Sequence, residues 1–340
     1  MDLGLITFGS LLPDVRTGAT LSQRQRLRDV VDAAKAAEDL GFAWYTVGEH
    51  HFRDRDVIPS PAVVLAAIAE NTSTIRLATG TTLVANRDPV LLAEDYALVD
   101  LLSDGRLEII VGGSFFPEPY VVFDQAPASK GARKRENLEL LQRLWTEDRV
   151  TWRGEFRPPL DDVLVQPRLL QPKPPLWISG GTNPDSIALA VEHGLPMVFG
   201  TTAREPSAFV PFFNAYRDQW RERRPDEPGQ LGAASHAFVA KTSQQARALW
   251  STYIETYLSA RATGPLDFDG HIGANGPALC GSPAEVVDKL GRLQQLWGHD
   301  LHLLSVDIGG IPYDVVQGAT ELIAAEVLPQ VRHGEVAASA

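Results

Sequence analysis

The order of apolar and polar positions along the chain predicts short strands that alternate with amphipathic helices. Eight apolar runs have the length and the flanking residues of strands: 3–8, 44–47, 75–84, 106–112, 176–179, 196–199, 233–240 and 302–307. Between them apolar side chains recur at helical spacing, as from Leu27 to Leu40 after the capping residue Ser22. This alternation predicts an α/β fold with parallel strands joined by right-handed crossovers.

The alternation is interrupted in two places. Between residues 115 and 175 only a helix at 135–145 is clear, and the polar, proline-rich remainder predicts an insertion that packs on the barrel. A second irregular zone covers residues 262–279, and both zones together suit a lid. We therefore expect one domain over residues 1–333, with insertions after strands 4 and 7, and a flexible C-terminal tail at 334–340.

Composition narrows the function classes. A net charge of -12 argues against nucleic acid and against an anionic membrane as partner, because both require a basic surface. No apolar run approaches the roughly 20 residues that span a bilayer. The single cysteine, Cys280, excludes an intrachain disulfide and a thiolate metal cluster. The chain begins almost directly with a strand-like segment and lacks the pattern of a signal peptide, so we expect a cytoplasmic protein.

The cluster Glu49-His50-His51-Phe52 directly follows the strand at 44–47. In a barrel of this type, side chains at the carboxyl ends of the strands carry the chemistry. Adjacent residues of an extended segment point to opposite sides, so His50 and His51 would bind one metal ion poorly, and no further ligand set is evident. Two interpretations of the histidines remain: a hydrogen-bonded pair without a catalytic role, or a histidine that acts as acid or base. Because imidazole titrates near neutral pH, we favour the second interpretation.

A second candidate site lies between the strand at 176–179 and the next helix, in Gly180-Gly181-Thr182-Asn183-Pro184-Asp185-Ser186. Glycine lets the backbone approach an oxyanion, and a helix N-terminus supplies free N–H groups and the positive end of the helix dipole. Thr182, Asn183 and Ser186 add polar donors. The segment is thus either a phosphate cradle or an ordinary capped turn.

Two other strands contain glycine where a ligand could come close. Gly112 and Gly113 end the strand at 106–112, and the small residues there would let a flat ring lie against the barrel mouth, with Phe115 and Phe116 as apolar walls. Gly80 lies inside the strand at 75–84, where glycine weakens a strand unless something must approach the backbone.

Taken in order, these segments resemble the bacterial luciferase-like, flavin-dependent monooxygenases over nearly the whole chain. The matching motifs are Gly41-Phe42 with Glu49-His50-His51-Phe52; Thr79-Gly80 through Arg87-Asp88-Pro89-Val90; Ala93-Glu94-Asp95 with Leu101-Leu102-Ser103-Asp104-Gly105-Arg106-Leu107; Gly194-Leu195-Pro196-Met197; and Gly281-Ser282-Pro283-Ala284-Glu285-Val286. Their order and spacing together are specific.

The resemblance implies a (β/α)8 TIM barrel that binds reduced FMN at the carboxyl ends of its strands. A separate flavin reductase would supply the reduced flavin, which reacts with O2 to a C4a-peroxide that oxygenates a small, mainly apolar organic substrate. His50 matches the catalytic histidine of the family, with Glu49 beside it. The flavin-binding positions would be Gly80, Thr81, Gly112, Gly113, Thr182, Asn183 and Ser186, with no metal ion.

The resemblance also implies a non-prolyl cis peptide at Gly80-Thr81, beneath the flavin ring, and a homodimer. Gly113 departs from the pattern, because a phosphate-binding arginine often stands there in the family; Arg87 is one basic residue that could compensate. Two alternatives remain open. One is a deazaflavin-dependent hydride-transfer oxidoreductase on the same barrel, and the other is a non-catalytic flavin-binding subunit, which the intact Glu49-His50-His51 disfavours.

Overall fold

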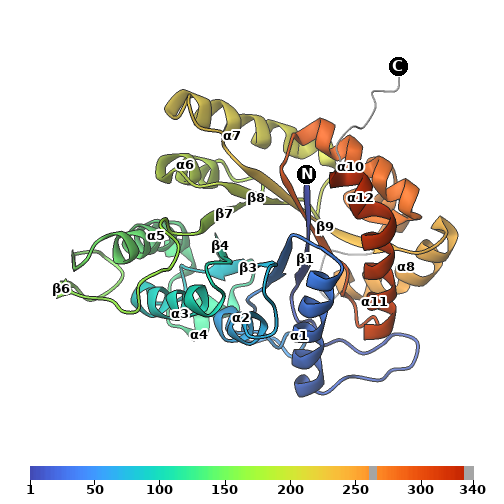
Figure 1. The fold of residues 1–340 in the computed structure, drawn as a ribbon, viewed down its shortest axis with the longest axis horizontal. Coiled ribbons are helices and arrows are strands. Elements are labelled where there is room, and N and C mark those ends of the chain that lie inside the picture. Colours follow the sequence, from blue (N-terminus) through green and yellow to red (C-terminus); the bar gives the residue numbers. More distant parts are fainter. Residues whose placement is uncertain (260–265, 333–340) are drawn as a thin grey trace.

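In the computed structural model, which describes residues 1–259 and 266–332, eight parallel strands close into a ring (Figure 1). In ring order they are β1 (Asp2–Thr7), β2 (Trp44–Val47), β3 (Arg76–Leu83), β4 (Leu107–Gly112), β7 (Leu176–Gly180), β8 (Met197–Gly200), β9 (Leu231–Val239) and β11 (Leu301–Ser305). Every predicted strand is present, with each end within two residues of the prediction. The predicted (β/α)8 TIM barrel is therefore confirmed.

Helices surround the ring and connect consecutive strands (Figure 1). They are α1 (Gln23–Asp39), α2 (Pro61–Ala69), α3 (Pro89–Leu102), α4 (Glu118–Val122), η1 (Pro127–Ser129), α5 (Lys130–Thr146), α6 (Pro184–His193), η2 (Pro206–Phe209), α7 (Val210–Arg223), α8 (Ser243–Ser259), α9 (Phe268–Ile272), α10 (Pro283–Trp297), α11 (Tyr313–Leu322), η3 (Ile323–Val327) and α12 (Leu328–Arg332). Local sequence sets several starts: Ser22 caps α1, and Asp88 caps α3 before Pro89.

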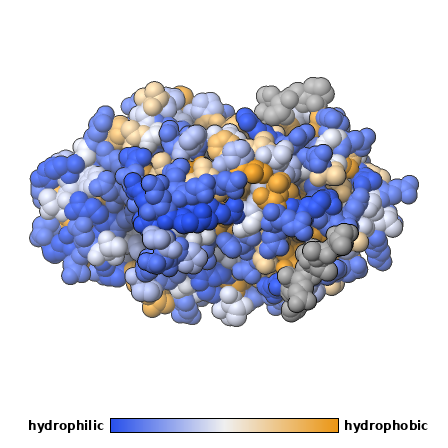
Figure 2. Space-filling view, turned by 90° about the horizontal axis from the view of Figure 1, so that it is seen from above, coloured by the Kyte–Doolittle hydropathy of each residue, from blue (hydrophilic) through white to orange (hydrophobic). Residues whose placement is uncertain are grey.

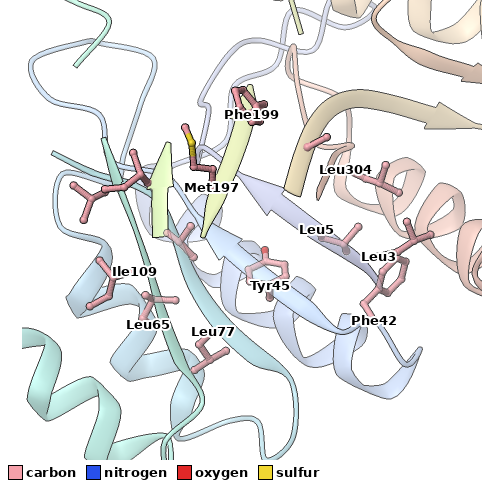
Figure 3. Packing of buried hydrophobic residues seen from close by; sticks show 14 of the residues in the cluster. Leu3, Leu5, Phe42, Tyr45, Leu65, Leu77, Ile109, Met197, Phe199 and Leu304 are labelled. Carbon is pink, nitrogen blue, oxygen red and sulfur yellow. The ribbon is translucent and has the colours of Figure 1, made fainter. Parts of the chain in front are cut away.

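The side chains on both faces of the barrel strands are buried. Toward the barrel axis they present an inner cluster: Ile6, Trp44, Ala78, Ile110, Trp177, Val198, Leu301 and Leu303. The alternate residues pack outward against the helices, where Figure 3 shows Leu5, Tyr45, Leu77, Ile109, Met197, Phe199 and Leu304. Complete burial of one such aliphatic side chain contributes about 2 kcal/mol to folding, so the ring of strands is a rigid support for whatever its loops carry.

The insertion after β4 is more ordered than the sequence indicates. The helix predicted at 135–145 starts earlier, because α5 begins at Lys130, in a charged stretch that contains Gly131 and lacks apolar spacing. The proline-rich part contains an antiparallel pair, β5 (Val150–Trp152) and β6 (Leu160–Val163), beyond α5 at one end of the molecule (Figure 1). These strands are short and contain exposed polar residues, so the apolar pattern of the sequence does not indicate them.

The insertion after β9 contains α8, α9 and the short strand β10 (Leu279–Gly281), which pairs with the far end of β9. Part of the irregular zone predicted at 262–279, and the tail predicted at 334–340, lie outside the described residues. On the face seen in Figure 2, hydrophilic residues predominate and apolar ones are scattered. Within residues 1–259 and 266–332, no helix has both the length and the apolar composition to cross a membrane.

Candidate active site at the carboxyl ends of the strands

Directly above the inner cluster, glycine recurs at positions that face the barrel axis. Because side chains alternate along a strand, the residues two or four places after members of the inner cluster point to the same side. These residues include Gly48, Gly80, Gly112 and Gly200. A Cβ atom on Gly80 would lie 2.6 Å from Cγ2 of Thr46, and one on Gly112 would lie 2.4 Å from Oγ1 of Thr81. Both positions need glycine, because a neighbouring side chain already fills the space of a Cβ atom.

The Gly80-Thr81 peptide bond is cis, as the resemblance implies. It lies in the third strand of the ring, next to Gly112 on β4, and the Thr81 side chain packs over Gly112. The structure therefore brings together Gly80, Thr81 and Gly112, three of the residues predicted to contact a flavin.

His50 is held between two aromatic rings at the end of β2. Its imidazole stacks on Phe8, with ring centroids 5.2 Å apart and planes within 7°, and the edge of Phe116 lies 5.8 Å away. Its Nδ1 is 3.2 Å from a carboxylate oxygen of Asp56, and the His50 side chain is 15% exposed. The ring is thus fixed in orientation, has an acidic neighbour and still reaches solvent, as a proton-transferring group requires.

Asp56 also faces a cation. Nε of Arg53 lies 3.7 Å from the carboxylate oxygen that approaches His50, and Nη1 of Arg53 lies 3.4 Å from Glu118 on α4. The guanidinium carbon is 3.8 Å from the centroid of the Phe116 ring, a cation–π distance. One arginine therefore connects the loop after β2 with the insertion after β4, and it closes this side of the mouth.

Glu49 and His51 point away from His50 and form their own pair. Nε2 of His51 lies 2.8 Å from one oxygen of Glu49, and the other oxygen accepts a hydrogen bond from the backbone N–H of Leu83 at 3.1 Å. Glu49 is only 3% exposed. The carboxylate thus fastens the loop after β2 to the end of β3. Among the described residues, no group of three or more His, Cys, Asp or Glu side chains is arranged to hold a metal ion.

The predicted phosphate cradle lies at the junction of β7 and α6. Asn183 caps α6, since its side chain accepts a hydrogen bond from the N–H of Asp185 at 3.0 Å. Ser186 in the first turn is buried, and Thr182 is partly exposed. Strand β7 pairs with β4, so this junction is adjacent to the strand end that carries Gly112 and Gly113. All predicted binding residues therefore lie at the ends of three neighbouring strands, β3, β4 and β7.

Two lysines at this junction were not predicted as site residues from the sequence. Nζ of Lys134 donates a hydrogen bond to Oγ of Ser186 at 3.2 Å, and Nζ of Lys130 donates to the carbonyl of Ser114 at 2.5 Å. Their spacing of four residues could have revealed them only if α5 had been predicted to begin at Lys130. Arg87 instead pairs with Asp95, at 3.3 Å.

A separate groove of about 980 Å³ lies between α8 and α11 on the outside of the barrel. Leu249, Val315 and Leu322 are among the residues that line it, and none of the predicted site residues does. The predicted site residues lie instead at the mouth of the barrel.

Known proteins resemble this chain over nearly its whole length. The model of the luciferase-like monooxygenase family matches residues 6–300. The chain is 26% identical to the oxygenase component of the flavin-dependent trigonelline monooxygenase of Acinetobacter baylyi, over 93% of this chain and 92% of that protein. Monooxygenase RslO1 from Streptomyces bottropensis superimposes with a TM-score of 0.89 at 27% identity, over 97% of this chain and 100% of that chain.

A more distant solved structure shares the fold. It is the oxygenating constituent of 3,6-diketocamphane monooxygenase from Pseudomonas putida, in complex with FMN, with a TM-score of 0.81 at 21% identity over 97% of this chain and 98% of that one. The fold and the family match together place the chain among TIM-barrel monooxygenases. The chain belongs to the luciferase-like monooxygenase family, as the sequence motifs predicted.

Proposed function

We propose that the protein is an FMN-dependent monooxygenase that inserts one oxygen atom into a small, mainly apolar organic substrate. The observation that carries the proposal is the His50 imidazole, held by Phe8 and Phe116 next to Asp56 at the mouth of the barrel. Bound reduced FMN would supply two electrons, so that one atom of O2 enters the substrate and the other leaves as water.

The residues at the mouth fit such a cofactor. Thr81 and the glycines beside it would support a flat ring, and the space at Gly200 is open, because nothing lies within 4 Å of a Cβ placed there. Thr182, Asn183 and Ser186 would contact the phosphate at the start of α6, and Gly113 lies on the adjacent strand end. This set offers apolar support for the ring at one end and polar donors at the other.

His50 would hold and transfer a proton during oxygen insertion. Asp56 lies at Nδ1, which leaves Nε2 as the atom that can exchange a proton with substrate. The flanking aromatic rings limit the access of water to the imidazole. Glu49 would have a structural role, because its carboxylate binds His51 and the backbone at the end of β3.

Aromatic side chains around the mouth support an apolar substrate. Phe115 is 84% exposed and packs edge-on against Phe116, and Phe52 packs against Phe123 with centroids 5.2 Å apart. Phe52 comes from the loop after β2, and the other three come from the insertion after β4, which is one of the two zones predicted to form a lid. An exposed phenyl ring at the mouth of the barrel gains free energy when an apolar molecule covers it.

Two partners follow from this function. The trigonelline relative is named as an oxygenase component, which supports a separate flavin reductase for this protein too. A homodimer is supported by apolar side chains on the outer sides of α2 and α3, where Val63 is 70% exposed, Leu91 57% and Leu98 50%. Contact with a second copy would cover these residues, and sedimentation of a Leu98→Lys variant against wild type measures it: a monomeric wild type would refute the dimer.

The proposed function is tested with reduced FMN and 18O2. The wild-type protein should bind reduced FMN, consume O2 and place one labelled oxygen atom in the product of an active compound found among aldehydes, sulfonates and aromatic metabolites. Product without label, or turnover that needs a reduced deazaflavin and no O2, would establish hydride transfer instead. FMN binding without O2 consumption would indicate a non-catalytic flavin-binding subunit.

A further inference from the structure

We infer that Lys130 and Lys134, one turn apart at the start of α5, bind the phosphate monoester of the flavin in place of the arginine that the chain lacks at position 113. This inference rests on the proposed use of FMN. It extends that proposal by adding two cationic side chains to the cradle formed by Thr182, Asn183 and Ser186.

Lys130 occupies the space that a side chain at position 113 would fill. A Cβ atom on Gly113 would lie only 2.6 Å from Cε and 3.5 Å from Nζ of Lys130. The ammonium group is held by the carbonyl of Ser114 at 2.5 Å, directly after the glycine pair that ends β4. Glycine at position 113 therefore admits a lysine from α5, and the positive charge comes from a different element of the fold.

Lys134 brings a second charge to the neighbouring strand end. Its Nζ lies 3.2 Å from Oγ of Ser186, in the first turn of α6, where backbone N–H groups and the positive end of the helix dipole favour an anion. Residues four apart on a helix lie on the same face, so both lysines project from α5 toward the ends of β4 and β7.

Neither of these two charges is in contact with a carboxylate of the described residues, and Asp185 in the first turn of α6 acts on Lys134 only from beyond ion-pair distance. In the described part of the chain, no carboxylate lies within ion-pair distance of either ammonium group, although most arginines near the mouth are paired. Burial lowers the pKa of both lysines, and the charge of Lys130 lowers the pKa of Lys134 further. A bound dianion would relieve both effects, because it compensates positive charge that is already partly removed from water.

The test compares reduced FMN with reduced riboflavin, which has the same ring and no phosphate. Anaerobic titration calorimetry would measure Kd for both flavins on wild type, Lys130→Ala, Lys134→Ala, the double variant and Lys134→Arg, which keeps the charge. Lys35→Ala is the matched control, because Lys35 is an exposed lysine on α1, away from the mouth. Thermal melts confirm that each variant is folded.

Each alanine substitution should weaken FMN binding about 10- to 100-fold, the range for a hydrogen bond to a charged group, and leave riboflavin binding unchanged. Lys134→Arg should retain most of the FMN affinity, and Lys35→Ala all of it. Unchanged FMN affinity in the double variant, or an equal loss for riboflavin, would overturn the inference. If wild type bound neither flavin, the proposed function itself would fail; normal FMN binding by every variant would remove only the two lysines.

Discussion

The two ends of the barrel each contain a pair of histidines, and the pairs differ in every property that matters for chemistry. At the mouth, His50 and His51 face the carboxylates of Asp56 and Glu49, and their side chains are 15% and 9% exposed. At the base, Nε2 of His299 lies 2.9 Å from Nδ1 of His302 at the start of β11, and both are fully enclosed.

The burial of each imidazole and the groups next to it determine whether it can exchange a proton. Burial lowers the pKa of His302 to about 3 and keeps the pKa of His299 well below its usual value, so the base pair stays neutral and serves as packing under Trp297. At the mouth, His50 has a carboxylate next to its Nδ1, and solvent can reach the ring. Residue type alone does not identify a catalytic histidine; its surroundings do.

The largest expected effect is a loss of turnover when the histidine at the mouth is replaced, but not when a histidine at the base is replaced. His50→Ala should lower turnover about 10²- to 10⁴-fold, the usual contribution of a general acid or base, with the Kd for reduced FMN within about twofold of wild type. Steady-state oxygen uptake and anaerobic flavin titration measure the two quantities. A His302→Gln variant, assayed while folded, should keep its turnover. Unchanged turnover in His50→Ala would remove the catalytic role of this residue.

The second prediction concerns stability in acid. The folded-state pKa values of His299 and His302 lie below the ordinary value near 6.5, so between about pH 6.5 and pH 3 the unfolded chain binds more protons than the folded protein. Stability should therefore fall as the pH falls through this window, by up to about 1.4 kcal/mol per pH unit for each histidine. Denaturant titrations at pH 7, 6 and 5 measure the slope.

His302→Gln provides the comparison for that slope. Glutamine keeps a hydrogen-bonding group beside His299 but does not titrate, so the acid-dependent loss of stability should become less steep by the share of one histidine. His193 and His271, whose pKa values burial also lowers, keep their contributions. The Lys35→Ala variant serves as control and should keep the wild-type slope, because an exposed lysine stays charged throughout this pH range. Identical slopes for wild type and His302→Gln would show that the base pair is not the acid-sensitive element.

Much of the fold could be predicted from the sequence because its signals are local. Short apolar runs between amphipathic helical segments predicted all the barrel strands. Ser22 acts as the predicted cap, because its side chain accepts a hydrogen bond from the N–H of Gln25. The cis peptide at Gly80-Thr81 was implied by family resemblance, since no local pattern indicates it. The β5–β6 hairpin was missed because its strands, of three and four residues, are too short to establish an alternation of buried and exposed positions.

The partners of the site residues could not be predicted, because tertiary contacts determine them. Lys134 reaches Ser186 across 52 positions of the chain, and Arg53 reaches Glu118 across 65. Asp56 is close to His50 in sequence, but the irregular loop between them gives no spacing rule that would place the carboxylate at the imidazole. The sequence thus identified the histidine, and only the fold shows what orients it.

The smallest expected effect tests that orientation. Asp56→Asn keeps the size of the side chain but removes its charge, which leaves His50 without its acidic neighbour and Arg53 with only Glu118. Turnover should fall about tenfold, roughly 1.4 kcal/mol of transition-state stabilisation, while FMN affinity stays constant. Asp54→Asn is the matched control, because Asp54 is exposed two residues away. Equal turnover in both variants would mean that the aromatic rings alone position His50, and that its carboxylate neighbour has no part in the chemistry.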